Sequence, residues 1–577
     1  MRLRWQGRKA VGKTAGEASS RSADGRAGLP ACLLSRGVVR LPAGRVPLAR
    51  VLALAGLLGM LSTAGAQSHE PEEIRLLPPV QLSGQTAPVR GEAAQGERAR
   101  ADGSIRMAAM FEWPMTDTAE RAILSEEAMT TLAAGTLTTS GIDAGAFGLV
   151  VQPLGEGRLR VNHQGARAFN PASTMKLVTT HAALSMLGPD YHWATRFHTR
   201  GVLRDGVLTG DLIIQGGGDP RLLIEDLRAL IADMRAGGLH TIKGNLVIDD
   251  SRFSARAALS RAFDGDASQA YNVQPYAALM NFKATRLMAD PKNRRLTVDP
   301  PLADVQLRYD VRVLKGRCRP GLTRLGVKES VGRNGKPVIT VKGTQVRACG
   351  AQQFYAAVLD HQQFVHGIFK AAWQEMGGRF HGRTLVRAGA AATATPYLTW
   401  LSSRNLSDVV HDINKFSNNV MTRMLLLEMA VVRGQGALPA EAAGRWLHRW
   451  YQAQGLAMPS LVVENGSGLS RRERISASDM VSMLKVAARS ETAPWFESSL
   501  PVVGIDGTMR ARLRHDPVAG QAQIKTGTLN DVRAIAGYVT AASGQRYAVS
   551  LMINGHFEAR RALAGQDELL RWIYRNG

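Results

Sequence analysis

The sequence has few of the features that support a membrane-spanning, metal-binding or nucleotide-binding protein. No apolar run in its 577 residues reaches the roughly 20 residues that a bilayer-spanning helix needs, which excludes a polytopic membrane protein. Its 13 histidines include no H-E-x-x-H motif, and Cys318 and Cys349 cannot form a structural zinc site alone. The glycines at 216–218 lack the strand, helix and lysine of a phosphate-binding loop. We therefore expect no metal and no other cofactor.

The N-terminal segment is typical of an export signal. Basic residues precede an apolar run over residues 51–61, and small residues follow up to Ala66 in an A-x-A order. We expect cleavage after residue 66, which would release the mature protein into the periplasm, and an uncleaved signal anchor is the alternative. Residues 67–118 are rich in Glu, Pro, Gly, Gln and Ala, and this composition predicts a flexible tether.

Acidic residues are scarce relative to basic ones. The chain holds 72 Lys and Arg against 48 Asp and Glu, a net charge of +24. Residues 1–66 contain 11 of the basic and two of the acidic residues, so 15 net positive charges belong to the rest. For an exported protein this excess favours an anionic wall, or peripheral contact with an anionic membrane surface, over nucleic acid. A solvated surface without a partner is the alternative.

Cysteine usage agrees with export. Cys32 falls in the expected signal segment, so that Cys318 and Cys349 remain as a pair. In an oxidising compartment such a pair predicts a disulfide, which would stabilise by roughly 3–4 kcal/mol, and two free thiols are the alternative.

Hydrophobic patterning divides the remaining chain into three parts. Residues 119–190 show a helical stripe, a strand–turn–strand pattern and an apolar helix opened by Asn170 and Pro171. Residues 191–350 consist of short β-like runs separated by Gly and Asp, and residues 351–577 return to long helical patterns, including one over 407–432, before three strands and a final helix. This order predicts an α/β domain, formed by the first and third parts, that a β-rich insertion interrupts.

A serine and a lysine fall together at the start of the apolar helix. Ser173 and Lys176 are three residues apart, so they share one helix face within its first turns. A serine hydroxyl becomes a nucleophile when a neighbouring base removes its proton, and a buried lysine with a lowered pKa can be that base. The helix start also supplies backbone donors for an oxyanion. An ordinary pair on a helix surface is the alternative for this motif taken alone.

Two further motifs strengthen this interpretation. Ser417 and Asn419 begin a strongly apolar helix, and there a hydroxyl and an amide would point into a cleft, although Ser417 could simply cap the helix. Lys525, Thr526, Gly527 and Thr528 end a predicted strand. The glycine would let a substrate backbone approach the strand edge and Lys525 would attract a carboxylate, whereas an ordinary turn is the alternative.

Together, in this order, S-x-x-K, S-x-N and K-T-G are the signature set of penicillin-binding proteins and serine β-lactamases. From about residue 120 onward the sequence resembles the low-molecular-mass class C penicillin-binding proteins, the D-alanyl-D-alanine carboxypeptidases/endopeptidases of the DacB type. The segments at 216–220, 465–471 and 504–510 add to the resemblance, as does the gap of 244 residues between Ser173 and Ser417.

The resemblance implies a penicillin-binding, transpeptidase-like (serine β-lactamase-like) α/β domain whose β-rich insertion forms two smaller domains. It also implies action on the peptide stems of peptidoglycan and covalent inhibition by β-lactam antibiotics. Ser173 would attack the carbonyl that follows a D-alanine, with Lys176 as the base. Ser417, with Lys525, would relay a proton to the leaving amine, and Asn419 would bind the substrate or Lys176.

The resemblance further implies substrate contacts and an oxyanion hole. The N–H groups of Ser173 and Thr528 would form the hole. Contacts near the substrate stem would come from Thr526 and Gly527 of the K-T-G segment, and from Arg471 and Asn530. Asp266 and Tyr271 in the insertion would hold a diaminopimelate-type residue, with a solvated loop acid as the alternative for Asp266.

Two other classes of function remain as alternatives. A serine β-lactamase needs rapid deacylation, and no local pattern places the glutamate that activates water in class A enzymes. An inactive peptidoglycan-binding module is the second alternative, against which the retained Ser173, Lys176, Asn419 and Lys525 argue.

Overall fold

The computed structural model describes residues 125–253 and 262–577, all within the unit Ile74–Gly577. The expected signal segment and tether lie outside the described residues. Within the described ranges no helix combines the length and the apolar character needed to cross a bilayer. Helices alternate with several sheets, and this confirms the predicted α/β class.

The helices and strands have the following bounds. The α-helices are α1 (Glu126–Thr138), α2 (Met175–Leu187), α3 (Ile224–Ala236), α4 (His361–Glu375), α5 (Leu406–Phe416), α6 (Asn419–Val432), α7 (Ala440–Ala453), α8 (Ala477–Ala487), α9 (Ala493–Ser498) and α10 (Ala559–Asn576). The 3-10 helices are η1 (Ala144–Ala146), η2 (Ala172–Thr174), η3 (Ala270–Asn272), η4 (Asn281–Lys283), η5 (Arg347–Cys349), η6 (Ala390–Thr393) and η7 (Gly507–Met509). The strands are β1 (Phe147–Pro153), β2 (Val161–His163), β3 (Ala168–Phe169), β4 (Ala194–Arg204), β5 (Val207–Gln215), β6 (Thr241–Ile242), β7 (Leu246–Asp249), β8 (Thr285–Asp290), β9 (Arg295–Asp299), β10 (Gln306–Leu314), β11 (Arg324–Val331), β12 (Pro337–Val346), β13 (Gln352–Ala356), β14 (Arg379–Phe380), β15 (Thr384–Val386), β16 (Thr395–Leu401), β17 (Ile475–Ser476), β18 (Ala522–Leu529), β19 (Val532–Thr540) and β20 (Arg546–Asn554).

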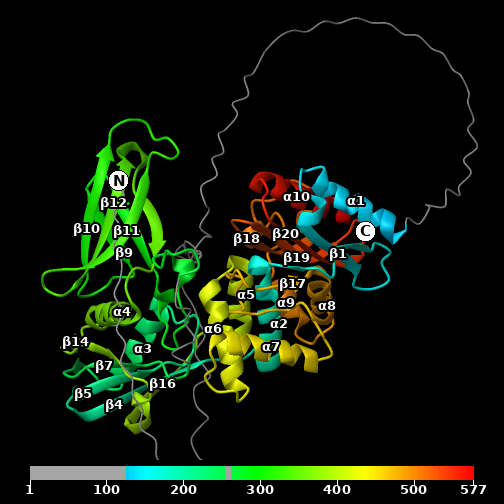
Figure 1. The fold of residues 1–577 in the computed structure, drawn as a ribbon. Helices are drawn as coiled ribbons and strands as arrows, with labels where there is room; N and C mark the ends of the chain where they lie inside the picture. The colour runs from blue at the N-terminus through cyan, green and yellow to red at the C-terminus, as the bar shows by residue number, and fades with distance from the viewer. Residues whose placement is uncertain (1–124, 254–261) are drawn as a thin grey trace, which may run out of the picture. The chain divides into compact units, whose positions relative to one another are not determined.

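A five-stranded antiparallel sheet brings together the two ends of the described chain. Its order is β18-β19-β20-β1-β2, so the last strands of the chain pair with the first (Figure 1). Helices α1 and α10 pack against each other and share a core with the sheet, whereas α8 contacts β1 and β20 within a second core. Most side chains of the three inner strands β1, β19 and β20 are buried, as expected for a sheet covered on both faces.

Helix α2 lies in the middle of the second core. Eleven of its 13 residues are buried, and α5, α6, α8 and α9 all contact it. An apolar helix without a polar face is stable only in such surroundings. The helix ends at Gly188, whose φ of 80° suits glycine. This burial removes the first turn of α2, which contains Lys176, from water.

The inserted region is built on a larger sheet with helices against it. Strands β4, β5, β6, β14 and β16 form its main path, and β7 pairs with β5 and β15. Helices α3 and α4 share a core with this sheet, so the region that we expected to be β-rich also contains a helix, α3, within residues 191–350. Residues 351–401, which we assigned to the second part of the catalytic domain, pair and pack with the inserted region instead. The helical pattern within residues 351–401 fits either domain, so it does not show to which of the two these residues belong.

The predicted helical stretch over 407–432 is divided in two. Helix α5 ends at Phe416, and Ser417 follows in the left-handed conformation with φ 60°. The side chain of Asn418 then accepts the N–H of Met421 at 3.1 Å and caps α6. The helix start that the motif at residues 417–419 predicts is confirmed by α6, whereas the longer helical pattern over 407–432 does not reveal the break before it.

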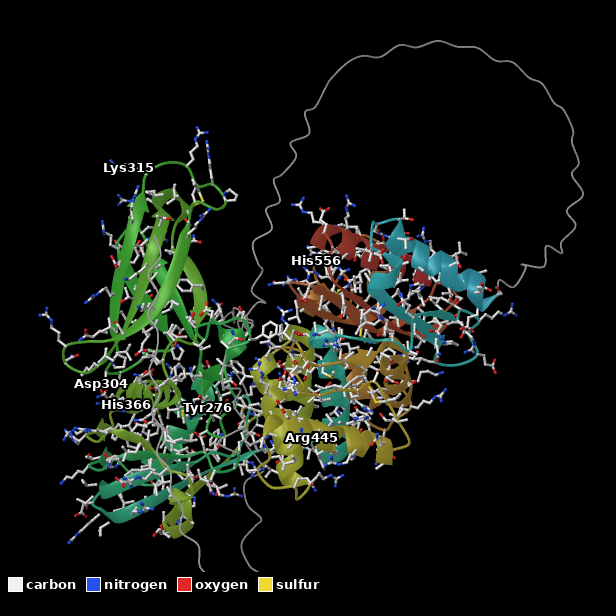
Figure 2. The ribbon with its side chains drawn as sticks, viewed as in Figure 1. Tyr276, Asp304, Lys315, His366, Arg445 and His556 are labelled. Atoms are coloured by element: carbon white, nitrogen blue, oxygen red, sulfur yellow. A yellow bond between two sulfur atoms is a disulfide. The ribbon has the colours of Figure 1, made fainter. Side chains whose placement is uncertain are left out.

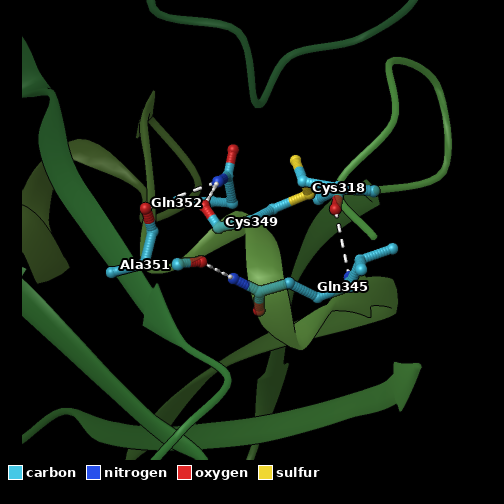
Figure 3. Close-up of a disulfide and its surroundings, with 8 residues drawn as sticks. Cys318, Gln345, Cys349, Ala351 and Gln352 are labelled. Carbon is cyan, nitrogen blue, oxygen red and sulfur yellow. Dashed lines mark hydrogen bonds between the residues drawn. A yellow bond between two sulfur atoms is a disulfide. The ribbon is translucent and has the colours of Figure 1, made fainter. Parts of the chain in front are cut away.

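A three-stranded sheet, β10-β12-β11, carries the disulfide. Cys318, in the loop between β10 and β11, is bonded to Cys349 in η5, 31 residues later (Figure 3). The Gln345 amide donates to the carbonyls of Ala289 and Gly350, and Gln352 donates to the Cys349 carbonyl. The bond therefore ties a surface loop to the end of the central strand of this sheet.

Candidate active site

The predicted nucleophile lies in a tightly held turn. Ser173 is the middle residue of η2, directly before α2, and Ala172 has a left-handed φ of 45°. Asn170 fixes the turn, because its Oδ1 accepts the Ala172 N–H at 2.9 Å and its Nδ2 donates to the Ser470 carbonyl at 2.8 Å. A non-glycine residue with this φ costs about 1–2 kcal/mol, so the surrounding contacts hold Ser173 in place.

Two glycines let neighbouring backbone reach this turn. A Cβ on Gly468 would lie 1.8 Å from the Ala172 carbonyl oxygen, and a Cβ on Gly527 would lie 2.6 Å from the Pro171 carbonyl oxygen. We expected Gly527 to make room for substrate, but the structure fills that space with the turn that carries Ser173. A side chain at either glycine would displace the serine.

Lys176 is buried and contacts the serine directly. Its Nζ donates to Ser173 Oγ at 2.9 Å, to Asn419 Oδ1 at 2.7 Å and to the Ser467 carbonyl. Burial lowers the pKa of Lys176 well below its ordinary value, and the positive charge of Lys525 lowers it further. The neutral amine is therefore accessible, and it is in position to accept the serine proton.

Ser417 and Lys525 form a second pair of hydroxyl and amine. Lys525 Nζ donates to Ser417 Oγ at 3.0 Å and to the Thr526 carbonyl at 2.8 Å. Lys525 is fully buried, and burial lowers its pKa to about 7. This amine can carry or release a proton near neutral pH.

The K-T-G strand presents an open edge. Strand β18 is the first strand of its sheet, so half of its N–H groups point away from β19. The N–H of Ile524 points outward, because it donates to the Pro501 carbonyl at 2.7 Å, and the N–H of Thr528, four residues on, points the same way. Strand β18 also contacts η2, which carries Ser173. Residues 501–503 are bonded to the first part of this edge, at residues 522–524. The predicted oxyanion donor of Thr528 lies farther along the same edge, beside the turn that carries Ser173.

A segment of the insertion borders this cluster, though not as predicted. Asn419 Nδ2 donates to the backbone carbonyl of Tyr271 at 3.2 Å, and the Tyr271 hydroxyl donates to Asp264. Asp266 accepts instead from Ser268 and Gln269, so the structure does not bring Asp266 to the Tyr271 side chain. Asp264, two residues away, occupies that position, and no sequence pattern distinguishes the two acids.

Burial would raise the pKa of Asp264, but hydrogen bonds from Tyr271 and Asn272 lower it below its usual value. Asp264 is therefore a carboxylate that stays ionised beside the cluster.

Arg471 and Asn530 lie on the exposed margin of the cluster. Arg471 forms an ion pair with Asp531, both side chains being about half exposed, and its guanidinium lies 4.7 Å from the centre of the Phe263 ring. Asn530 and Asp531 make the turn between β18 and β19, and Asn530 is exposed. Phe263 and Tyr271 pack on the small apolar group that contains Ala172, which is the residue before the nucleophile.

One buried residue of the cluster was not predicted from the sequence. Glu473 is fully buried and its carboxylate accepts four backbone N–H groups, those of residues 464, 465, 466 and 468, at 2.7–3.2 Å. These bonds shape the loop that presents the Ser467 carbonyl to Lys176, and the negative charge of Glu473 raises the pKa of Lys176. Glu473 lies two residues beyond the motif at 465–471 and belongs to no pattern of its own, so no sequence signal marks it.

The arrangement defines a class of enzyme. A serine opens a buried helix beside the edge strand of an antiparallel sheet, and two buried lysines donate to two serine hydroxyls. This is the design of the penicillin-binding serine enzymes, a class that also includes the serine β-lactamases. Among the described residues no group of three or more His, Cys, Asp and Glu side chains is arranged to hold a metal ion.

Comparison with known proteins assigns the family. Residues 131–575 match the D-Ala-D-Ala carboxypeptidase 3 (S13) family, and the chain belongs to that family. A D-alanyl-D-alanine carboxypeptidase from Actinomadura sp. (strain R39) is 29% identical over 449 residues, which are 75% of this chain and 82% of the relative. The D-alanyl-D-alanine carboxypeptidase DacB of Haemophilus influenzae is 25% identical over 71% of this chain and 85% of its own length.

A solved structure supports the fold. The crystal structure of penicillin binding protein 4 (dacB) from Haemophilus influenzae matches with a TM-score of 0.66 at 24% identity, over 77% of this chain and 99% of that one. The resemblance inferred from the motifs and the predicted fold class are confirmed.

Proposed function

We propose that the chain is a serine D-alanyl-D-alanine carboxypeptidase/endopeptidase that acts on peptidoglycan peptide stems through an acyl-enzyme on Ser173. Membership of the D-Ala-D-Ala carboxypeptidase 3 family supports the reaction class. The observation that carries the assignment of residues is the 2.9 Å hydrogen bond from the buried Lys176 amine to Ser173 Oγ. We propose Ser173, Lys176, Ser417, Asn419 and Lys525 as the catalytic residues.

Acylation begins when the neutral Lys176 amine takes the Ser173 proton. The serine oxygen then attacks the carbonyl carbon of a D-alanine, at the peptide bond that joins this residue to the next one. The N–H groups of Ser173 and Thr528 stabilise the oxyanion that forms. One such donor is worth about 3 kcal/mol in a serine hydrolase. The Asn419 amide, which accepts from Lys176, holds the amine in line with the serine.

The leaving amine needs a proton as the peptide bond breaks. Ser417 delivers this proton, and Lys525, at 3.0 Å from Ser417 Oγ, resupplies it because its pKa of about 7 allows both states near neutral pH. Water then hydrolyses the ester on Ser173 and restores the free enzyme. β-Lactams acylate the same serine.

Substrate contacts come from the edge strand and from the bordering loops. Thr526 and Thr528 on the outer edge of β18 align the stem as an added strand, and Gly527 between them lets this edge approach the turn that carries Ser173. Arg471 and Asn530 flank the stem. Asp264, joined to the Tyr271 hydroxyl, is better placed than Asp266 for the free amino group of a diaminopimelate-type residue. An ionised Asp264 suits a cationic group.

We further propose that residues 1–66 direct export to the periplasm, where the stems are found, and that the mature protein touches an anionic membrane surface peripherally. The signal-like order of the N-terminal residues supports export, and the excess of basic residues supports the contact.

No feature of the site favours the β-lactamase alternative. The buried Glu473 lies near Lys176, but both of its oxygens accept backbone N–H groups and neither contacts Ser173. It is therefore in no position to activate a deacylating water on the model of the class A enzymes.

Intact mass spectrometry of the mature protein mixed with benzylpenicillin, sampled over hours, tests the proposal. We expect a long-lived adduct on the wild type and none on Ser173→Ala, together with release of D-alanine from a pentapeptide stem by the wild type alone. Ser185→Ala is the matched control, because Ser185 lies on the same helix and is exposed.

Each outcome has a clear meaning. Rapid loss of the adduct with turnover of the drug would favour a β-lactamase. An adduct that persists on Ser173→Ala would move the nucleophile to another residue, and no adduct at all would leave the peptidoglycan-binding module.

A further inference from the structure

The positive charge of the chain is concentrated in one small part of the insertion. Residues 306–349, which form β10, β11, β12 and their loops, contain 11 Lys and Arg against two acids. They therefore supply a net charge of +9 out of the +24 of the whole chain. Nothing in the proposed catalytic site uses these residues.

The strand register places five of these cations on one face of the sheet. Across β10, β12 and β11, Arg308, Thr340 and Lys328 form one row, and Arg312, Thr344 and Arg324 form another. The row between them is Asp310, Lys342 and Gly326. Paired residues point to the same side of a sheet, so Arg308, Arg312, Arg324, Lys328 and Lys342 share one face, and all five are exposed.

The opposite face of the same strands is apolar and covered. Val311, Ile339 and Val341 are buried in the core of the inserted region, and Leu325 and Val327 pack against it. One face of the sheet therefore packs against the core. Its other face presents the five cations on three strands that together are roughly 10 Å wide.

Four more cations gather where the disulfide joins the loop to η5. Arg317 and Arg319 flank Cys318, and Arg347 is two residues before Cys349. Lys315, which is labelled in Figure 2, lies in the same loop at the end of the sheet. The disulfide thus keeps the loop cations next to those of the strands. We call these four residues and the five on the strands the basic face.

Few carboxylates compensate this charge. Among the described residues, the one ion pair made by the basic face joins Lys342 to Asp310 at 3.8 Å, and both side chains are about 60% exposed. An exposed pair of this kind holds its partners weakly. The basic face therefore projects an almost uncompensated positive field.

An apolar side chain stands among these cations. Leu322 is 44% exposed in the loop between Arg319 and Arg324. Thr344 Oγ1 and Arg324 Nε donate to the carbonyls of Leu322 and Gly321, which orders the loop around it. Cations beside an exposed apolar side chain suit the interface of an anionic bilayer, whereas a hydrophilic wall polymer offers nothing to Leu322.

We infer that the basic face docks the protein onto anionic phospholipid at a membrane surface, with Leu322 entering the headgroup region. The inference deepens the proposed peripheral membrane contact by naming its surface. It does not depend on the peptidase activity, because the basic face shares no residue with the proposed catalytic site.

Co-sedimentation of the mature protein with vesicles tests the inference. Vesicles of phosphatidylglycerol and phosphatidylcholine, or of phosphatidylcholine alone, would be compared at 50 mM and 500 mM salt. We expect binding to the anionic vesicles at low salt, little binding at high salt and none to neutral vesicles. Combining Arg308→Gln, Arg312→Gln, Arg324→Gln and Lys328→Gln should weaken binding by roughly a thousandfold.

A matched variant removes the same charge elsewhere. Arg433→Gln, Arg445→Gln, Arg449→Gln and Arg514→Gln are all at exposed positions outside the insertion, and together they should weaken binding less than threefold. Leu322→Ser should weaken vesicle binding and leave binding to the soluble polyanion heparin unchanged. The rate of acylation by benzylpenicillin verifies that every variant is folded. If the wild-type protein bound vesicles but showed no peptidase activity, the proposed function would fail while this inference would stand.

Three outcomes would overturn the inference. Equal losses in the two quadruple variants would show that net charge acts without a defined surface. Equal binding to neutral and anionic vesicles would remove the electrostatic basis. Retention on purified peptidoglycan that depends on the basic face, without vesicle binding, would make the wall polymer the partner.

Discussion

The buried cations of the candidate active site and the exposed cations of the basic face differ in almost every physical respect. Lys176 and Lys525 are fully buried, and burial lowers the pKa of both. The nine cations of the basic face are exposed to solvent and share one ion pair among the described residues. In the roles proposed above, one set would act over hydrogen-bond distances on single protons, whereas the other would act over a Debye length on a surface.

The number of cations in a region of this chain therefore says little about their role. Water stabilises an exposed guanidinium or ammonium, so it stays charged and exchanges partners freely. A buried lysine loses that stabilisation and becomes a group that can be neutral at physiological pH. Burial thus separates the basic residues that we propose for proton transfer from those that we propose for docking to a surface.

Removing a buried cation should have the largest effect. Lys176→Met should lower the rate constant for acylation by benzylpenicillin at least about a thousandfold, because Ser173 loses its base. Stopped-flow or quenched-flow mass spectrometry measures this rate. Lys328→Met on the basic face is the control and should acylate at the wild-type rate. A Lys176→Met rate within tenfold of wild type would erase the distinction between the two sets.

Releasing the loop of the basic face should have the next largest effect, and on stability alone. The combined Cys318→Ser and Cys349→Ser variant should lose roughly 3–4 kcal/mol of unfolding free energy, because a cross-link between residues 31 apart no longer restricts the unfolded chain. Denaturant unfolding measures the loss. Acylation should stay within twofold of wild type, and a large fall in that rate would mean that the two regions are coupled.

Changing the charge that faces the buried lysine should have a smaller effect with a distinctive pH signature. Glu473→Gln should slow acylation by about 10–100-fold, because a neutral amide cannot hold four N–H donors. The Glu473 charge raises the pKa of Lys176, so its removal should move the acid limb of the rate profile to lower pH. An unmoved limb would reduce Glu473 to a structural role.

The control for this variant is Glu441→Gln, which breaks a largely exposed ion pair with Arg472 and should leave both the rate and the pH profile unchanged.

The smallest effect should come from the single carboxylate of the charged sheet. Asp310→Asn should change the unfolding free energy by less than about 1 kcal/mol, since its pair with Lys342 is long and exposed. It should strengthen binding to anionic vesicles by no more than about fivefold, as one opposing charge is removed. Thermal unfolding and vesicle co-sedimentation check the two values, and weaker vesicle binding would contradict the basic face as a docking surface.

The sequence predicted the parts of the site that depend on side-chain type and order. Ser173, Lys176, Ser417, Asn419 and Lys525 lie in motifs that can be read directly from the sequence. The fold joins Lys176 to Ser173 and Asn419, and Lys525 to Ser417, by hydrogen bonds. The α/β class was equally accessible, because strands and helices of opposite periodicity are easily separated.

The remainder depends on backbone geometry that side-chain patterns do not encode. The Ser467 carbonyl contacts Lys176 as a main-chain atom, and Glu473 acts by gathering N–H groups of a loop. Asp264 and Asp266 differ only in which of them faces the Tyr271 hydroxyl. Residues 351–401 have helical and strand patterns that fit either side of the boundary, and pairing partners far along the chain decide their place.

The left-handed conformation of Ser417 has a consequence for engineering. A residue that follows a helix in this conformation is most stable as glycine, and replacing serine with glycine would relieve strain. The same replacement would delete the hydroxyl that Lys525 contacts. Thermostabilisation guided by backbone preference alone would therefore select Ser417→Gly. We expect that variant to be more stable but slower, so stability screens of this chain should also measure activity.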